Sequence, residues 1–214
     1  MTGLFSPELF AGQVVLITNA GPWSAELADA FRRGGAAVAT THRSEKATVV
    51  LDTSDAAAVA EAFDAVEARF GQPSILINGP GERRELAAAD TRLADWRRIT
   101  EPNYDGVFLC CAEFARRRIG AEQRGWILNL IDTPDPVGHA AEVAAAAGVA
   151  NLIKTLGAEW ARDGLRVNGL ASRGWARSPT PAASAQSLTA MALYLCSPYS
   201  GFVTASTLEI DAHD

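Results

Sequence analysis

The stretch QVVLITNAGPWSAELADAFRRGG at residues 13–35 contains an apolar run, a turn and an amphipathic run in direct succession. The first run is continuously apolar, which is typical of a strand that is covered on both faces. In the second run apolar residues recur at helical spacing, and Arg32 and Arg33 precede Gly34, which favours a helix end there. The stretch therefore predicts a strand over 13–18 followed by a helix over 24–33.

The same alternation continues along the chain and predicts an α/β fold. Strands and helices that alternate with short connections form a doubly wound parallel sheet of the Rossmann type, with helices on both faces. Ligands of such sheets bind beyond the carboxyl ends of the strands. We expect about seven strands in all. The further strands are expected at 36–41, 48–52, 74–78, 126–131, 165–170 and 207–211, and the further helices at 55–70, 104–119, 141–162 and 185–196.

Composition narrows the class of protein. The chain has 214 residues, 48% hydrophobic and 21% charged, which is ordinary for a globular protein and predicts a single domain over residues 1–214. A net charge of -6 with no basic stripe argues against a nucleic-acid or membrane partner. Three cysteines without a C-x-x-C pair indicate a reduced, cytoplasmic protein. No cluster has the spacing of metal ligands, so no metal site is expected.

Six segments at the predicted strand ends resemble the short-chain dehydrogenase/reductase family, in the family's order and over nearly the whole chain. The resemblance implies a shortened version of that family's Rossmann-type fold, for an oxidoreductase that uses a dinucleotide. The segments are ITNAGPWSAELADAF at 17–31, LDTSD at 51–55, INGPG at 77–81, PNYDGVFLC at 102–110, ILNLIDT at 127–133 and RVNGLASRGW at 166–175.

The resemblance also assigns cofactor-binding positions, but the phosphate loop is degraded. The family's TGxxxGxG loop is one residue shorter here and keeps only Gly21 between Ile17 and Gly34. Glycines let the backbone approach a pyrophosphate, whereas Trp23 puts a ring where phosphate would rest. We therefore expect no cofactor or a weakly bound one, and NADP(H) if any. The assigned positions are Asn19, Gly21, Trp23, Arg43, Ser44, Asp52, Asn78 and Gly79.

Two short segments resemble the pteridine reductase-like branch of the family. THRSEKA at 41–47 is similar to a turn of NADPH-preferring members, so Arg43 and Ser44 would hold a 2′-phosphate. NLID at 129–132 is similar to a motif in which an aspartate replaces the catalytic serine. The alternative for Arg43 and Ser44 is an exposed turn.

The family's catalytic tyrosine, and the lysine four residues after it, are absent. The alignment of NLIKTLGAEWA at 151–161 with the family places Glu142 at the tyrosine position and Ala146 at the lysine position. Loss of a positioned acid–base group costs about 10²–10⁴ in rate. The resemblance makes Asn103, Asp132 and Glu142 the candidate catalytic residues. The alternatives are a solvated turn for Asp132 and complementarity to the helix dipole for Glu142.

These losses lead to one main expectation and two alternatives. The main expectation is a catalytically degenerate subunit, which would pair with itself or with an active relative through helices 104–119 and 141–162. The first alternative is an NADPH-dependent oxidoreductase whose altered acids are Asp132 and Glu142. The second is a non-redox lyase or isomerase that uses the same carboxylates.

Overall fold

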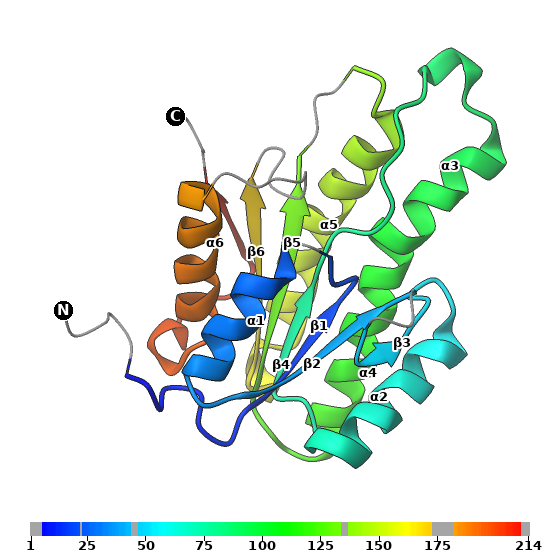
Figure 1. The fold of residues 1–214 in the computed structure, drawn as a ribbon. Helices are drawn as coiled ribbons and strands as arrows, with labels where there is room; N and C mark the ends of the chain where they lie inside the picture. Colours follow the sequence, from blue (N-terminus) through cyan, green and yellow to red (C-terminus); the bar gives the residue numbers. More distant parts are fainter. Residues whose placement is uncertain (1–5, 22, 44–46, 134–136, 173–181, 211–214) are drawn as a thin grey trace.

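The computed structural model describes residues 6–21, 23–43, 47–133, 137–172 and 182–210, with the side chains of 182–184 left out. Seven strands form one sheet in the order β3-β2-β1-β4-β5-β6-β7, and every pair is parallel, as predicted (Figure 1). The strands are β1 (Val14–Thr18), β2 (Ala37–His42), β3 (Val49–Val50), β4 (Ile75–Asn78), β5 (Gly125–Asp132), β6 (Leu165–Ser172) and β7 (Ser206–Ile210).

Helices cover both faces of this sheet (Figure 1). One core lies under α1 and α6 and contains Leu27 and Phe31; the other lies under α2, α4 and α5 and contains Phe63 and Phe114. Because both faces are covered, the central strands are buried along their whole length, which explains their continuous apolar runs. The helices are α1 (Ser24–Arg33), α2 (Ala56–Phe70), α4 (Gly106–Gly120), α5 (Ala140–Glu159) and α6 (Ala182–Leu195).

Two helix boundaries differ from the predicted ones for identifiable reasons. Asp55, expected inside α2, is instead its N-cap and accepts the N–H groups of Ala57 and Ala58 at 2.8 and 3.4 Å. The helix expected over 141–162 ends at Glu159, and a 3₁₀ turn over Ala161–Asp163 leads to Gly164, which has a φ of 82°. Glycine adopts this left-handed conformation without strain.

One helix was missed by the sequence interpretation. It is α3 (Leu93–Thr100), which continues through a π-helical turn, Glu101–Asp105, into α4. The helix expected over 104–119 therefore begins at Gly106. Within the π turn, the Asn103 amide donates to the carbonyl of Ile99 at 2.8 Å. Such turns are common at functional sites; here the turn brings Asn103 to the end of the sheet where ligands bind.

The connection between β2 and β3 is short, and no membrane-spanning helix is found among the described residues. Strand β2 ends at His42 and β3 begins at Val49, which leaves no room for the helix that most family members have between these strands. In the part of the chain that the structure describes, no helix combines the length and the apolar character needed to cross a membrane.

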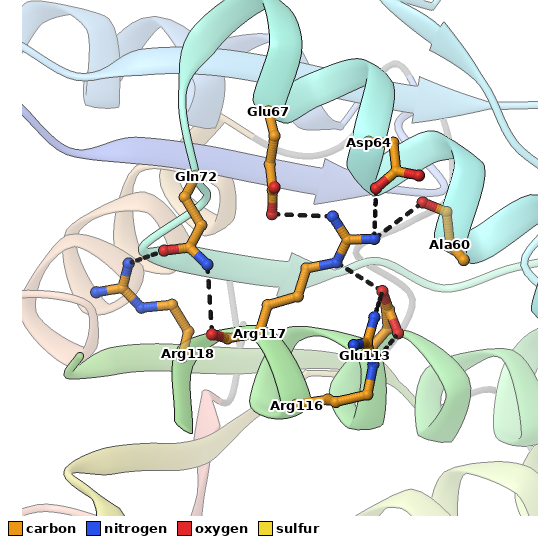
Figure 2. Close-up of polar contacts among 8 residues, drawn as sticks. All are labelled: Ala60, Asp64, Glu67, Gln72, Glu113, Arg116, Arg117 and Arg118. Carbon is orange, nitrogen blue, oxygen red and sulfur yellow. Dashed lines mark hydrogen bonds and ion pairs between the residues drawn. The ribbon is translucent and has the colours of Figure 1, made fainter. Parts of the chain in front are cut away.

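Arg117 of α4 ties that helix to α2 (Figure 2). Its guanidinium contacts three carboxylates, with Nη2 2.8 Å from Asp64, Nη1 3.0 Å from Glu67 and Nε 2.6 Å from Glu113. It also lies over the Phe63 ring. Although burial acts to lower it, the pKa of Arg117 is held above its usual value by the three carboxylates. We call these four charged residues the Arg117 cluster.

Candidate active site

A row of buried polar side chains crosses the strand ends beneath the site. In the strand register, Thr18 of β1 lies opposite Asn78 of β4, and Asn78 opposite Asn129 of β5. The Thr18 hydroxyl donates to Asn78 Oδ1 at 3.0 Å, and Asn78 Nδ2 donates to Asn129 Oδ1 at 2.9 Å. Asn78 Nδ2 also donates to the Cys111 sulfur at 3.2 Å. The Asn78 amide, which the resemblance assigns to the cofactor, is therefore committed to holding the strand ends together.

A small cavity lies just beyond this row, at the ends of β4 and β5. Its volume is about 40 Å³, and its wall includes Asn103, Asp132 and Glu142. Ala146, at the family's lysine position, lines the same cavity. The structure thus brings the three candidate catalytic residues together, although they come from three different elements.

Asp132 is the last residue of β5 and is buried in the cavity wall. Its Oδ2 forms an ion pair with Nη1 of Arg83, a residue of the loop that follows β4. The other terminal nitrogen of Arg83, Nη2, is buried and has no hydrogen-bond partner among the described residues. The alternative of a solvated turn for Asp132 is therefore wrong, because its carboxylate is covered and paired.

Glu142 lies in the first turn of α5, and its side chain is only 7% exposed. Its Oε1 accepts the backbone N–H of Arg84 at 2.7 Å and lies 3.4 Å from Nδ1 of His139. Its Oε2 is buried and has no hydrogen-bond partner among the described residues. A carboxylate whose only role was to complement the helix dipole would be left in water, so burial of Glu142 in the cavity indicates more than that role.

The loop over residues 81–86, here named the β4 loop, is held by all three candidate catalytic residues. Asn103 accepts the N–H of Gly81 at 2.7 Å and donates to the carbonyl of Glu82 at 2.6 Å. The Asp132 carboxylate pairs with the side chain of Arg83, and the Glu142 carboxylate accepts the backbone N–H of Arg84. Leu86 then pairs with the backbone beside α5 by donating to the carbonyl of Gly138 at 2.8 Å. The loop is thereby fixed along one side of the cavity.

The sequence analysis assigned no role to Arg83. The signal was present, because GERRE at 81–85 places two adjacent arginines directly after a predicted buried strand. Charged residues at that end of a strand point to a ligand site. The resemblance gave them no role, since the family's motif ends at the glycines before them.

The first of the two regions assigned to the cofactor is the turn after β1. Asn19 has a φ of 49° and donates to the carbonyl of Gly79 at 3.3 Å, so an asparagine provides the left-handed turn that glycine would otherwise supply. The indole of Trp23 packs on Gly79 so closely that a Cβ there would lie 2.2 Å from a ring atom, and it also contacts Gly21. The ring thus fills the space between the ends of β1 and β4.

The second region is an open cleft of about 460 Å³ beyond β2 and β3. Arg43 forms ion pairs there with Asp52 at 2.8 Å and Glu82 at 3.5 Å. The Ser54 hydroxyl donates to Asp52 at 2.6 Å; partial burial alone would raise the pKa of Asp52, but the hydrogen bonds from Ser54 and Arg43 outweigh it and the pKa is lowered. Arg97 and Arg98 of α3 also line the cleft. Ser44 lies outside the described residues.

These two regions allow a test of whether the chain fits a dinucleotide. The cleft is lined by three arginines and also by the carboxylates Asp52 and Glu101. Guanidinium groups suit an adenosine that carries a 2′-phosphate. Helix α1 begins just beyond the carboxyl end of β1, and no side chain caps its first N–H groups. Such a helix N-terminus suits a pyrophosphate. In the structure the Trp23 indole occupies the space beside Gly79, so a dinucleotide fits only if that ring moves. No group of three or more metal-ligating side chains is found among the described residues.

Comparison with known proteins decides the family. Residues 23–187 match the family model described as Enoyl-(Acyl carrier protein) reductase. The chain belongs to the short-chain dehydrogenase/reductase family. D-threitol dehydrogenase of Mycolicibacterium smegmatis is 33% identical to it, over 73% of this chain and 68% of the relative. Galactitol 2-dehydrogenase (L-tagatose-forming) of Cereibacter sphaeroides is 31% identical, over 88% of this chain and 80% of the relative.

A solved structure extends this similarity to the fold. The crystal structure of gluconate 5-dehydrogenase from Burkholderia cenocepacia J2315 in complex with NADP and tartrate has a TM-score of 0.83 and 27% sequence identity. The match covers 95% of this chain and 96% of that one. These relatives do not test the resemblance to the pteridine reductase-like branch, which stays a prediction.

The expectation of a catalytically degenerate, noncatalytic subunit is wrong. The relatives that match most of this short-chain dehydrogenase/reductase are named as dehydrogenases, at about 30% identity. The expectation rested on the absent tyrosine and lysine together with the degraded phosphate loop. The alignment had placed Glu142 at the tyrosine position, and the structure shows that its Oε2 is buried and has no hydrogen-bond partner among the described residues.

Proposed function

We propose that this chain is an NADP(H)-dependent oxidoreductase that interconverts an alcohol and a carbonyl compound, with Glu142 as its acid–base residue. The observation that carries the proposal is that Oε2 of Glu142, a residue of the cavity wall, is buried and has no hydrogen-bond partner in the part of the chain that the structure describes. Dehydrogenases act on this type of bond in the relatives named above. A carboxyl group is a competent general acid or base when it reaches the reacting oxygen.

The residues around Glu142 prepare it for this role. The Arg84 N–H holds Oε1, and this contact leaves Oε2 as the atom that gives a proton to the carbonyl oxygen in reduction or takes it from the hydroxyl in oxidation. His139, 3.4 Å from Oε1, exchanges the proton with the surroundings. When bound, NADP(H) supplies or accepts the hydride. Asn103 keeps the β4 loop, and with it the Arg84 N–H, in place.

The cofactor is assigned to the two regions described above. Arg43, with Arg97 and Arg98, would hold the 2′-phosphate, and Ser54 would contact the adenosine. The first-turn N–H groups of α1 would hold the pyrophosphate. This arrangement favours NADPH over NADH, because only the former carries a phosphate for the three arginines.

Calorimetric titration with NADPH and with NADH tests this proposal directly. We expect binding of both, with NADPH the tighter ligand, and oxidation of NADPH when a ketone or aldehyde is added. Absence of binding by either dinucleotide would remove the proposal and would favour chemistry without a nucleotide.

We also propose that the chain pairs with a second copy of itself through α4 and α5. Tyr104 of the π turn, Phe108 of α4 and Val143 of α5 leave large apolar side chains exposed. We expect light scattering to give a dimer or larger assembly. Phe108→Arg should dissociate it, whereas Leu93→Arg, at an exposed position on α3, should not.

A cytoplasmic location completes the proposal. Cys110, Cys111 and Cys196 are free and buried, which suits a reducing compartment. Fractionation of the native source should recover the protein with the cytoplasmic fraction; recovery with the envelope would contradict it.

A further inference from the structure

We propose that Arg83 is a second catalytic residue, whose Nη2 donates a hydrogen bond to the carbonyl oxygen of the substrate and stabilises the negative charge that develops there during reduction. This inference rests on the proposed function, because it adds a group to the same reaction in the same cavity. The segment that resembles the family's motif ends at Gly81, so the resemblance assigns Arg83 no role.

The reaction requires a hydrogen-bond donor at the carbonyl oxygen. Addition of a hydride to the carbonyl carbon places negative charge on that oxygen, and donors already in position there are usually the largest contribution to catalysis. The serine and lysine positions of the family hold Asp132 and Ala146 in this chain. An ionised carboxylate accepts hydrogen bonds but cannot donate one, and alanine has no polar side-chain atom. The donor must therefore come from another residue of the cavity wall.

The asparagines of the cavity wall already use their side-chain N–H groups within the protein. Asn78 and Asn103 each donate two hydrogen bonds through Nδ2, which exhausts the two hydrogens of an amide nitrogen. Asn129 lies in the buried row beneath the site and donates to the carbonyl of Asn168 at 3.5 Å. Among the described residues that line the cavity, Arg83 is the one whose buried side-chain donor has no hydrogen-bond partner.

An ion pair holds the guanidinium of Arg83 at the cavity wall. Its Nη1 pairs with Oδ2 of Asp132, the last residue of β5, whose side chain is buried. Its Nη2 is buried without a hydrogen-bond partner among the described residues, and native proteins rarely leave such a group unsatisfied. Because the guanidinium nitrogens form a rigid planar fork, the anchoring of Nη1 also restricts Nη2. Arg83 is thereby prepared for an oxygen atom that enters the cavity.

Arg83 and Glu142 act on the same oxygen in different ways. A guanidinium stays protonated in proteins, so Arg83 contributes a fixed positive charge and no proton. Glu142 lines the same cavity and transfers the proton through Oε2. Asp132 balances the charge of Arg83 when no substrate is bound.

The reaction balances without any covalent change at Arg83. In reduction, the carbonyl carbon gains a hydride from NADPH and forms a C–H bond, while the electron pair of the C=O π bond moves to the oxygen. Arg83 Nη2 donates its hydrogen bond to this oxygen, and the proton of Glu142 then forms the O–H bond. The products are the alcohol, NADP⁺ and the Glu142 carboxylate, which regains a proton from solvent.

The kinetic test measures oxidation of NADPH with butan-2-one as the probe ketone. In Arg83→Met, kcat should fall by about 10²–10³, the loss expected for removal of one such donor, while calorimetry should give the wild-type affinity for NADPH. This variant leaves Asp132 without its ion pair, so the double variant R83M/D132N removes both partners and should lose the same factor. Arg92→Met, which removes an arginine outside the cavity, should keep the wild-type kcat. Wild-type kcat in both Arg83 variants would overturn the inference.

Chemical rescue separates a catalytic role of Arg83 from a structural one. Arg83→Ala leaves space beside Asp132, so guanidinium chloride at low millimolar concentration, far below denaturing levels, should restore part of the lost kcat. Rescue should fail in R83A/D132N, which lacks the carboxylate that would hold the guanidinium, and in Glu142→Gln, which lacks the proton donor. No rescue of Arg83→Ala, or equal rescue of all three variants, would overturn the inference.

A spectroscopic measurement separates this inference from the proposed function. Butan-2-one labelled with carbon-13 at its carbonyl group is mixed with the protein and NADP⁺, which cannot reduce it, and its C=O stretch is read by infrared difference spectroscopy. A hydrogen bond from a cation is strong and lowers this frequency, so the wild-type protein should show a shifted band that Arg83→Met lacks.

The outcomes of the two measurements can be told apart. If the shifted band appears only with Arg83 present but NADPH is never oxidised, the contact of Arg83 with the carbonyl oxygen stands and the proposed function fails. If the wild-type protein and Arg83→Met oxidise NADPH equally fast, or if the wild-type protein shows no shifted band, the inference fails while the proposed function can stand.

Discussion

Two partly buried arginines in this molecule differ in how completely they are paired. Arg117 contacts carboxylates through all three guanidinium nitrogens and joins α2 to α4 (Figure 2). Arg83 contacts one carboxylate through Nη1, while its Nη2 is buried without a hydrogen-bond partner among the described residues. Both are surrounded by acidic side chains, but only the Arg117 cluster satisfies its central cation.

This difference in pairing distinguishes the Arg117 cluster, which is structural, from the cavity residues around Arg83, which are functional. A structural network gains stability by satisfying every member, because an unpaired buried charge is costly. A binding site accepts that cost in the free protein and recovers it when a ligand arrives. Substitutions should therefore reduce stability at the Arg117 cluster and reduce activity at the cavity.

The largest effect should come from Glu142→Gln. The amide keeps the shape of the side chain but cannot hold or release the transferred proton, so kcat should fall by about 10²–10⁴. Steady-state oxidation of NADPH measures the loss, and calorimetry should show that NADPH still binds. Activity within a few-fold of wild type would assign the proton transfer to another group.

The next effect is on stability, through Arg117→Met. This change removes the cation shared by Asp64, Glu67 and Glu113, of which Glu113 keeps Arg116, and the free energy of unfolding should fall by about 2 kcal/mol. Urea unfolding measures the change, and kcat of the remaining folded protein should match wild type. Arg32→Met is the matched control, because its pair with Asp29 on α1 is exposed and should contribute at most about 1 kcal/mol.

A smaller effect is expected at the turn after β1, from Trp23→Ala. The indole packs on Gly79 and Gly21, so cofactor binding requires it to rotate, and its removal should tighten NADPH binding roughly tenfold. Adenosine 2′,5′-bisphosphate, which needs only the arginine cleft, should bind the variant and the wild type equally. Weaker NADPH binding by the variant would show that the indole supports the cofactor instead of obstructing it.

The smallest effect is the pH dependence of the Arg117 cluster. Hydrogen bonds from Arg116 and then Arg117 outweigh burial and hold the pKa of Glu113 below its usual value. The stability that Glu113 contributes is therefore complete above the unfolded-state pKa of about 4.3 and is lost as pH falls through the lower, folded-state pKa.

Urea unfolding between about pH 2.5 and 6 measures this dependence. The wild-type protein should lose stability toward acid more steeply than Glu113→Gln, which has no carboxylate to protonate. Parallel curves for the two proteins would show that Glu113 does not contribute to the acid response.

The periodicity of the sequence was enough to predict the sheet, because strands buried on both faces leave unmistakable apolar runs such as VVLIT at 14–18. It did not predict α3, whose short apolar spacing at Leu93, Trp96 and Ile99 is interrupted by charged residues. The π turn was beyond such patterns as well, since it depends on the hydrogen bond of Asn103 to Ile99.

The candidate site was predicted only in part, because an alignment does not show how a loop folds or which atoms are hydrogen-bonded. The alignment placed Glu142 and Asp132 at catalytic positions, and the structure brings both to one cavity. It could not show that Arg83 enters the same cavity, because that depends on how the β4 loop folds back. Nor could it show which oxygen of Glu142 is left without a partner, and that detail separates an inert carboxylate from a usable one.

The hydrogen bonds that hold the β4 loop offer a way to detect ligand binding in the cavity. The amide protons of Gly81 and Arg84 are held by the side chains of Asn103 and Glu142. Their exchange with deuterated water therefore requires those two contacts to open. Exchange rates at these two positions, read peptide by peptide with mass spectrometry, would follow occupancy of the cavity without any substrate turnover, and would let unlabelled compounds be screened against the resting protein.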